Sequence, residues 1–179
     1  MSSFRWELEQ PYQCLKNEYS SRRRRIAMMG GGCNQEVTFT WLCDKINDAQ
    51  VVVLRASPGM DYTDWIKSHC PNVHLVETIL TMSREDAYNT NLVNTLMRAD
   101  VVLIDGGAQS NYIDFWQNTP LQDVLNAAIL NGVPIGGVSA GLAILGDYIF
   151  SLEKRYGVTD PLRSSDILMN PYNPQIRIR

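Results

Sequence analysis

The chain has 179 residues and a formal net charge of −3, with 45% hydrophobic and 20% charged residues. This length suits one domain with a sizeable core, and the composition is typical of an ordinary globular protein. The acidic balance gives no reason to expect a nucleic-acid partner, and no apolar run approaches the roughly 18 residues of a membrane-spanning helix.

Residues 1–24 precede the first strand-like run, and we expect them to form an N-terminal extension. They contain acidic residues and no continuous apolar core, which argues against a signal peptide. The run Arg22–Arg25 has two interpretations that stay open. It is either a solvated lead-in to the first strand or a targeting or anion-binding segment.

The cysteines and histidines do not indicate a metal site. The cysteines stand at positions Cys14, Cys33, Cys43 and Cys70, without a C-x-x-C pair or zinc-type spacing. His69 and His74 are five positions apart, which does not suit two ligands on one helix face. We therefore predict reduced thiols in a cytoplasmic protein, and no metal.

Apolar, strand-like runs recur along the chain. They are Arg25–Met29, Val51–Ala56, Val73–Ile79, Val101–Asp105 and Val133–Val138. The runs are mostly continuous rather than alternating, which favours strands that are buried on both faces of a parallel sheet.

Helix-like stretches separate these runs. Residues Thr119–Gln122 predict a helix start with a capping box, and Asn131-Gly132 predicts its end. A second helix is expected to open at Ser83 and to turn Val93, Leu96 and Met97 inward. Weaker patterns predict helices over Glu36–Ile46 and Tyr62–Ser68.

The alternation of strands and helices predicts a three-layer, doubly wound α/β domain with a mainly parallel sheet, spanning residues 25–179. Beyond Phe150 the pattern becomes polar and rich in proline. The last five residues, Gln175–Arg179, alternate and could begin another strand.

Functional groups in open α/β sheets gather at the carboxyl ends of the strands. Four of the five strand-like runs end there in glycine or in Ser-Pro-Gly. Glycine there permits close approach of the backbone to a ligand, although tight turns need it as well. The run Gly30-Gly31-Gly32 lacks G-x-G-x-x-G spacing. We therefore expect no dinucleotide cofactor, and a dinucleotide-binding oxidoreductase is disfavoured.

Ser139 lies in Gly137-Val138-Ser139-Ala140-Gly141, a G-x-S-x-G pattern between a strand and a helix. This pattern is typical of a nucleophile elbow, a sharp turn that lifts a serine hydroxyl above the sheet edge. The Ala140 amide and helix N-terminus would face a developing oxyanion, and Gly106-Gly107 could supply a second amide. The competing interpretation is a serine that caps a helix.

Two segments carry a family resemblance. The stretch from Ile104 to Ser139 contains Asp-Gly-Gly-Ala-Gln, a Thr-Pro-Leu helix start and Val-Ser-Ala-Gly, and Ile26–Gly32 ends in three glycines. They resemble cyanophycinase and dipeptidase E, serine peptidases with a class I glutamine-amidotransferase-like (flavodoxin-like) fold. The likeness spans roughly residues 25–179.

This resemblance implies that Ser139 is the nucleophile and that Gly107 and Ala140 provide the oxyanion-hole amides. It also implies that Gly106 and Gln109 line the substrate pocket; the competing interpretation of Gln109 is a polar residue at the start of a helix. The implied substrates are small aspartyl peptides, either β-Asp-Arg units or peptides with an N-terminal aspartate. Asp105, Ala108 and Val138 depart from the family's threonine, aspartate and threonine, which bears on substrate preference more than on fold.

The family's catalytic histidine lies downstream of the serine, and no histidine follows Ser139 in this sequence. His69 and His74 are expected at the opposite edge of the sheet. Lys154, the nearest downstream lysine, is either the base of a Ser-Lys arrangement or, as we favour, a solvated helix residue. Three accounts stay open: a truncated enzyme, a base supplied by a partner chain, or a catalytically silent ligand-binding or scaffold domain. Apolar surface left uncovered by an incomplete tail would favour a homodimer.

Overall fold

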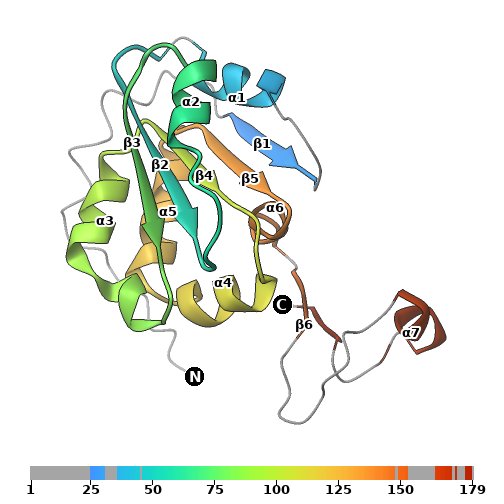
Figure 1. Cartoon of the computed structure of the whole chain (residues 1–179). Coiled ribbons are helices and arrows are strands. Elements are labelled where there is room, and N and C mark those ends of the chain that lie inside the picture. Colours follow the sequence, from blue (N-terminus) through green and yellow to red (C-terminus); the bar gives the residue numbers. More distant parts are fainter. Residues whose placement is uncertain are drawn as a thin grey trace.

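The computed structural model describes residues 25–30, 36–44, 46–147, 149–152, 164–170, 172 and 176–178. A five-stranded sheet with the order β1-β5-β4-β2-β3 forms its centre (Figure 1). In chain order the elements are β1 (Ile26–Met29), α1 (Glu36–Cys43), β2 (Ala49–Arg55), α2 (Thr63–His69), β3 (Val73–Leu80), the 3₁₀ helix η2 (Glu85–Tyr88), α3 (Thr90–Met97), β4 (Val101–Ile104), α4 (Gln109–Trp116), α5 (Pro120–Leu130), β5 (Ile135–Val138), α6 (Ala140–Ala143), β6 (Phe150–Leu152), α7 (Ser164–Met169) and β7 (Ile176–Ile178).

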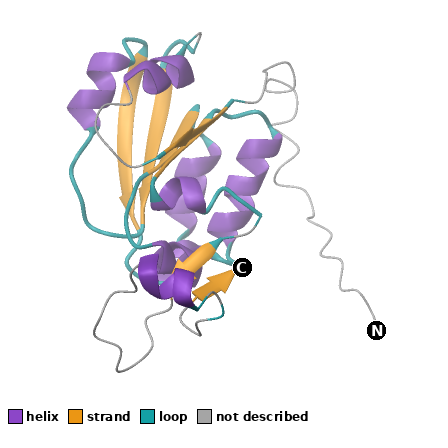
Figure 2. Cartoon of the chain, turned by 90° about the vertical axis from the view of Figure 1, so that its right-hand side faces the viewer, coloured by secondary structure: helices purple, strands orange, loops and turns teal. Residues whose placement is uncertain are grey.

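All strand pairs in the main sheet are parallel. The side chains of β2 and β4 alternate between two hydrophobic cores, one on each face. Leu54 and Ile104 pack with α3, α4 and α5, whereas Val53 and Leu103 pack with α1 and α2. Figure 2 shows the strands with helices on both faces, and the predicted three-layer, mainly parallel α/β fold is confirmed.

The helix expected to open at Ser83 is instead two short helices, η2 and α3. The Asp86 carboxylate accepts the backbone N–H groups of Met82 and Ser83 at 2.7 and 3.0 Å. Asn89 then has an extended backbone, and its side-chain oxygen accepts the N–H groups of Asn91 and Leu92. Asp86 therefore fixes the turn before η2, Asn89 caps the start of α3, and the extended backbone of Asn89 prevents a continuous helix.

The start of α5 lies where the sequence predicts it, but the predicted capping box is wrong, because Thr119 and Gln122 make other hydrogen bonds. The Thr119 hydroxyl donates to the carbonyl of Trp116 at 2.6 Å, and Gln122 Oε1 accepts the N–H of Asn118 at 2.7 Å. The two side chains therefore stabilise the turn that precedes α5 and do not cap the N-terminus of α5. At the other end, Gly132 has a φ of 79°, the left-handed conformation expected after a helix.

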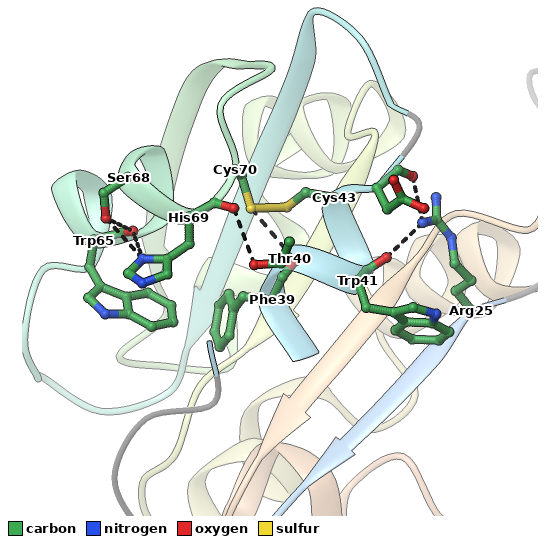
Figure 3. Close-up of a disulfide and its surroundings, with 10 residues drawn as sticks. Arg25, Phe39, Thr40, Trp41, Cys43, Trp65, Ser68, His69 and Cys70 are labelled. Atoms are coloured by element: carbon green, nitrogen blue, oxygen red, sulfur yellow. Dashed lines mark hydrogen bonds between the residues drawn. A yellow bond between two sulfur atoms is a disulfide. The ribbon is translucent and has the colours of Figure 1, made fainter. Parts of the chain in front are cut away.

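A disulfide joins Cys43, at the end of α1, to Cys70, directly after α2, so the prediction of reduced thiols is wrong for this pair. Figure 3 shows the bond between the Trp65–His69 stack and Arg25. The Arg25 guanidinium donates to the carbonyls of Trp41 and Asp44, and it thereby gives backbone carbonyls at the C-terminal end of α1 a hydrogen-bond donor. Arg25 is therefore more than a solvated lead-in residue.

β6 and β7 form a separate antiparallel pair, which Figure 1 shows beside α7 and apart from the main sheet. The alternating fragment at the end of the sequence thus contains a strand. In the part of the chain that the structure describes, no helix is long and apolar enough to cross a membrane. The predicted extension 1–24, Gly31 and Gly32 lie outside the described residues.

Candidate active site

The strand order reverses between β2 and β4. From β2 the chain moves outward to β3 and then returns to the other side of β2 to form β4. The connections that leave these two strands diverge, and a crevice forms at their carboxyl ends. Residues that directly follow β2, β4 and β5 are therefore the ones placed to meet a ligand.

Ser139 follows β5 and has a φ of 52° and a ψ of −114°. A non-glycine residue in this region is uncommon and costs on the order of 1–3 kcal/mol. Its N–H donates to the Met29 carbonyl of β1 at 2.9 Å, and its side chain makes no capping hydrogen bond to α6. The structure therefore contradicts the helix-cap interpretation and leaves Ser139 exposed on a strained turn.

The flanking glycines are required by the backbone packing around this turn. A Cβ on Gly137 would lie 2.4 Å from the carbonyl oxygen of Gly141. A Cβ on Gly141 would lie 2.2 Å from the carbonyl oxygen of Ile104 in β4. The G-x-S-x-G spacing thus lets α6 fold back against the ends of β4 and β5 beneath the serine.

Gly106 lies against Ser139. A Cβ on Gly106 would be 3.4 Å from Ser139 Cβ and 3.9 Å from Ser139 Oγ. Gly107 follows with a φ of 154° and is exposed, and Ala140 is the buried first residue of α6. The structure therefore brings the two predicted glycines of the turn and the predicted serine to one edge.

The dipole of α6 would stabilise an oxyanion less than the sequence suggests, because α6 has only four residues. A macrodipole is the sum of aligned peptide dipoles, so four residues contribute little. The amides near Ser139 matter here as individual hydrogen-bond donors rather than as the end of a long helix.

Tyr112 of α4 contacts the Asp105–Gly106 turn through its hydroxyl. No pattern in the sequence singles out this residue. Its hydroxyl donates to the carbonyl of Asp105 at 2.6 Å and lies 3.1 Å from the carbonyl oxygen of Gly106. The side chain is 1% exposed. Burial raises the pKa of Tyr112 to about 12, so the hydroxyl stays a protonated donor at neutral pH.

Arg55, at the end of β2, forms a buried ion pair with Asp105, the residue before Gly106. The same guanidinium donates to the Met60 carbonyl and lies 5.5 Å from the centre of the Tyr62 ring. The pair therefore ties the segment after β2 to the segment after β4. An arginine within the apolar run of β2 was the available sequence signal for this contact.

Two further polar side chains join the same segments. The Asn111 amide nitrogen donates to the Ala56 carbonyl at 2.9 Å and to Ser57 Oγ at 3.3 Å. Ser57 Oγ also lies 3.5 Å from the Ala108 nitrogen, within reach of its N–H. A Cβ on Gly107 would lie 3.0 Å from this oxygen, so a larger residue would crowd the turn.

A cavity of about 270 Å³ opens beside the serine turn on the α1 and α2 side of the sheet. Its lining includes Val138 and Asp105, which precede Ser139 and Gly106, and the aromatic side chains of Phe39, Tyr62 and Trp65. Most of this wall is apolar, so it suits an aliphatic or aromatic group of a ligand.

Asp61 places a carboxylate at the same cavity. Hydrogen bonds from the Thr63 hydroxyl and backbone N–H hold the pKa of Asp61 below its usual value. The carboxylate is therefore ionised at neutral pH. Gln109, the predicted pocket residue, is the half-buried first residue of α4, directly after the glycine turn.

Neither histidine is near this edge. His69 is the last residue of α2, where it stacks on Trp65 and lies 3.6 Å from the Glu36 carboxylate. His74 lies near the start of β3, with Nδ1 3.3 Å from the Asp48 carboxylate. Because parallel strands share their direction, the start of β3 lies at the edge opposite Ser139. Lys154 lies outside the described residues.

The sequence is similar to known peptidases. The model of peptidase family S51 matches residues 60–168, which is more than half of the chain and includes Gly106, Gly107 and Ser139. The uncharacterized peptidase YgaJ of Bacillus subtilis (strain 168) is 36% identical over 53 residues, which cover 30% of this chain and 23% of YgaJ.

Two solved structures share the fold. A peptidase from an acI-B1 Actinobacterium matches with a TM-score of 0.53 and 17% identity over 71% of this chain and 57% of that one. A proposed peptidase E from Listeria monocytogenes EGD-e matches with a TM-score of 0.50 and 17% identity over 69% of this chain and 61% of that one. The chain thus spans less than two thirds of each relative. On the match to its family model, this chain belongs to peptidase family S51.

Proposed function

We propose that the chain provides the nucleophile of a serine peptidase that cleaves aspartyl peptides through an acyl-enzyme at Ser139. The strained backbone of Ser139 is the observation that carries this proposal, because it holds the side chain of an exposed serine at the carboxyl edge of the sheet. Membership of peptidase family S51 supports the reaction class.

In this reaction the Ser139 hydroxyl attacks the scissile carbonyl and its proton passes to a general base. The carbonyl oxygen carries the negative charge of the tetrahedral intermediate, which the amides of Gly107 and Ala140 would stabilise. Collapse breaks the amide bond, the leaving amine takes the proton, and water hydrolyses the ester. We place the general base outside the described residues, because both histidines lie at the opposite edge.

The aspartyl preference is carried by the resemblance of the Gly106–Gln109 turn to that of cyanophycinase and dipeptidase E. The cavity next to the turn would take the residue beside the aspartate. Its aromatic walls and the Asp61 carboxylate favour an apolar or cationic side chain there and disfavour a second acidic one.

A fluorophosphonate probe tests the nucleophile. We expect one adduct on Ser139 in the wild-type protein and none in Ser139→Ala, with mass spectrometry as the readout. Ser68→Ala is the matched control, because Ser68 is another accessible serine hydroxyl and lies far from the glycine turn, in α2. Added imidazole should accelerate the labelling, since it can take the serine proton in place of the general base. Folded protein that stays unlabelled with and without imidazole would contradict the proposal.

The position of the two histidines favours a second candidate, a domain that binds aspartyl compounds without turnover. It predicts that β-Asp-Arg raises the melting temperature of the wild type and of Ser139→Ala alike, with no free arginine released. Release of arginine that disappears in Ser139→Ala would exclude this candidate.

A further inference from the structure

The buried hydroxyl of Tyr112 contacts two successive carbonyl groups of the turn that faces Ser139. It donates to the Asp105 carbonyl at 2.6 Å, and the Gly106 carbonyl oxygen lies 3.1 Å away. One hydroxyl hydrogen serves both oxygens, with the shorter contact to Asp105. Both carbonyls therefore point toward α4.

The direction of these carbonyls decides where the next amides point. The described part of the chain has no cis peptide bond, and in a planar trans peptide the N–H points opposite to the C=O. The N–H groups of Gly106 and Gly107 are thus directed away from α4. Two successive amides with a shared direction form a concave site for an anion, and Gly106 lies against Ser139.

The Tyr112 ring is fixed by its surroundings. It packs edge-on against Trp116 with ring centres 4.7 Å apart, and the Trp116 indole N–H donates to Thr81 Oγ1 at 2.7 Å. Thr81 in turn donates to the Arg55 carbonyl at 3.0 Å. The hydroxyl is therefore a stationary donor that holds the turn from below, while Arg55 holds the Asp105 side chain.

We propose that Tyr112 is a positioning residue, whose hydroxyl directs the Gly106 and Gly107 amides toward the oxyanion that forms when Ser139 attacks. This inference rests on the proposed role of Ser139. It also extends that role, because it explains how a glycine turn without side chains keeps one orientation.

The variant Tyr112→Phe tests the proposal, because it removes the hydroxyl and keeps the ring. Tyr88→Phe is the matched control, since Tyr88 also donates to a backbone carbonyl, that of Asn118, away from the turn. The maximal rate of fluorophosphonate labelling should fall roughly 10- to 100-fold in Tyr112→Phe, somewhat less than the loss of a whole oxyanion donor. The probe concentration at half-maximal rate should stay within about twofold, since the ground-state pocket is unchanged.

A second readout does not depend on labelling. In protein labelled with ¹⁵N-glycine, the amide signals of Gly106 and Gly107 should shift or broaden in Tyr112→Phe and stay in place in Tyr88→Phe. Unmoved glycine signals, or a labelling rate equal to that of the wild type, would overturn the role of Tyr112. If the wild type is not labelled at Ser139, the proposed function fails, and the glycine signals still decide whether the hydroxyl orients the turn.

Discussion

Gly137 and Gly141 show how single atoms determine the shape of the serine turn. Each faces a backbone carbonyl at a distance that leaves no room for a Cβ. Backbone atoms cannot change rotamer, so the only relief is movement of β4, β5 or α6. The motif around Ser139 is therefore a packing requirement as well as a chemical one.

We expect Gly141→Ala to destabilise the fold by about 1–3 kcal/mol or more, because the new methyl group would overlap the Ile104 carbonyl. Gly30→Ala is the control: a Cβ there meets nothing within 4 Å, and we expect a change within about 0.5 kcal/mol. Urea denaturation of both variants measures the difference. Equal midpoints for the two would show that the packing at Gly141 is looser than the structure indicates.

At the residue scale, the sequence predicts Ser139 and its glycines because they form one short contiguous motif. It does not predict Tyr112, which has no spacing rule that links it to the turn. Arg55 and Asp105 are far apart in the sequence and meet only because β2 and β4 are neighbours in the sheet. Contacts of this kind depend on strand order, which local patterns do not contain.

The elements were predicted best where burial alone decides them. The continuous apolar runs of β2 and β4 fall within two residues of the observed strands, because both faces of these strands are covered. The helices were harder, because polar side chains decide where they begin and end. Asn89 is the clearest case, since its capping hydrogen bonds separate η2 from α3.

We expect Asn89→Ala to reduce stability by about 1 kcal/mol, because the N–H groups of Asn91 and Leu92 lose their acceptor. Asn89→Ser keeps a side-chain oxygen at this position and should restore most of the loss. Thermal unfolding followed by circular dichroism checks both. If alanine and serine behave alike, the cap contributes nothing to α3.

At the scale of the whole molecule, the disulfide between Cys43 and Cys70 joins the two helices that cover one face of the sheet. Those helices also carry Phe39 and Trp65 of the cavity beside the serine turn. Disulfides persist mainly in oxidising compartments, so this bond removes the support that the cysteines gave to a cytoplasmic location. That location stays a prediction.

Reduction should lower the stability of the wild-type protein by about 2–4 kcal/mol, because the bond closes a loop between residues separated by 27 positions. Urea midpoints with and without dithiothreitol measure this loss, and the variant with Cys43→Ala and Cys70→Ala should not respond to the reductant. Alkylation without reductant should leave Cys43 and Cys70 unmodified. A wild-type midpoint that ignores dithiothreitol would argue against the bond.

In the described sheet β1 pairs with β5 alone, and Ile26 of β1 lies opposite Ile135. A nascent chain that emerges from the ribosome therefore holds its first strand without a partner until β5 has been synthesised. During that interval β1 has unpaired backbone groups that chaperones and other chains can bind. Met28, which is 71% exposed even in the folded sheet, adds an apolar side chain to this surface. β5, which leads directly into Ser139, is the last strand of this sheet to be synthesised, so a translation product that stops before it would lack both the nucleophile and the strand that β1 pairs with in the described sheet.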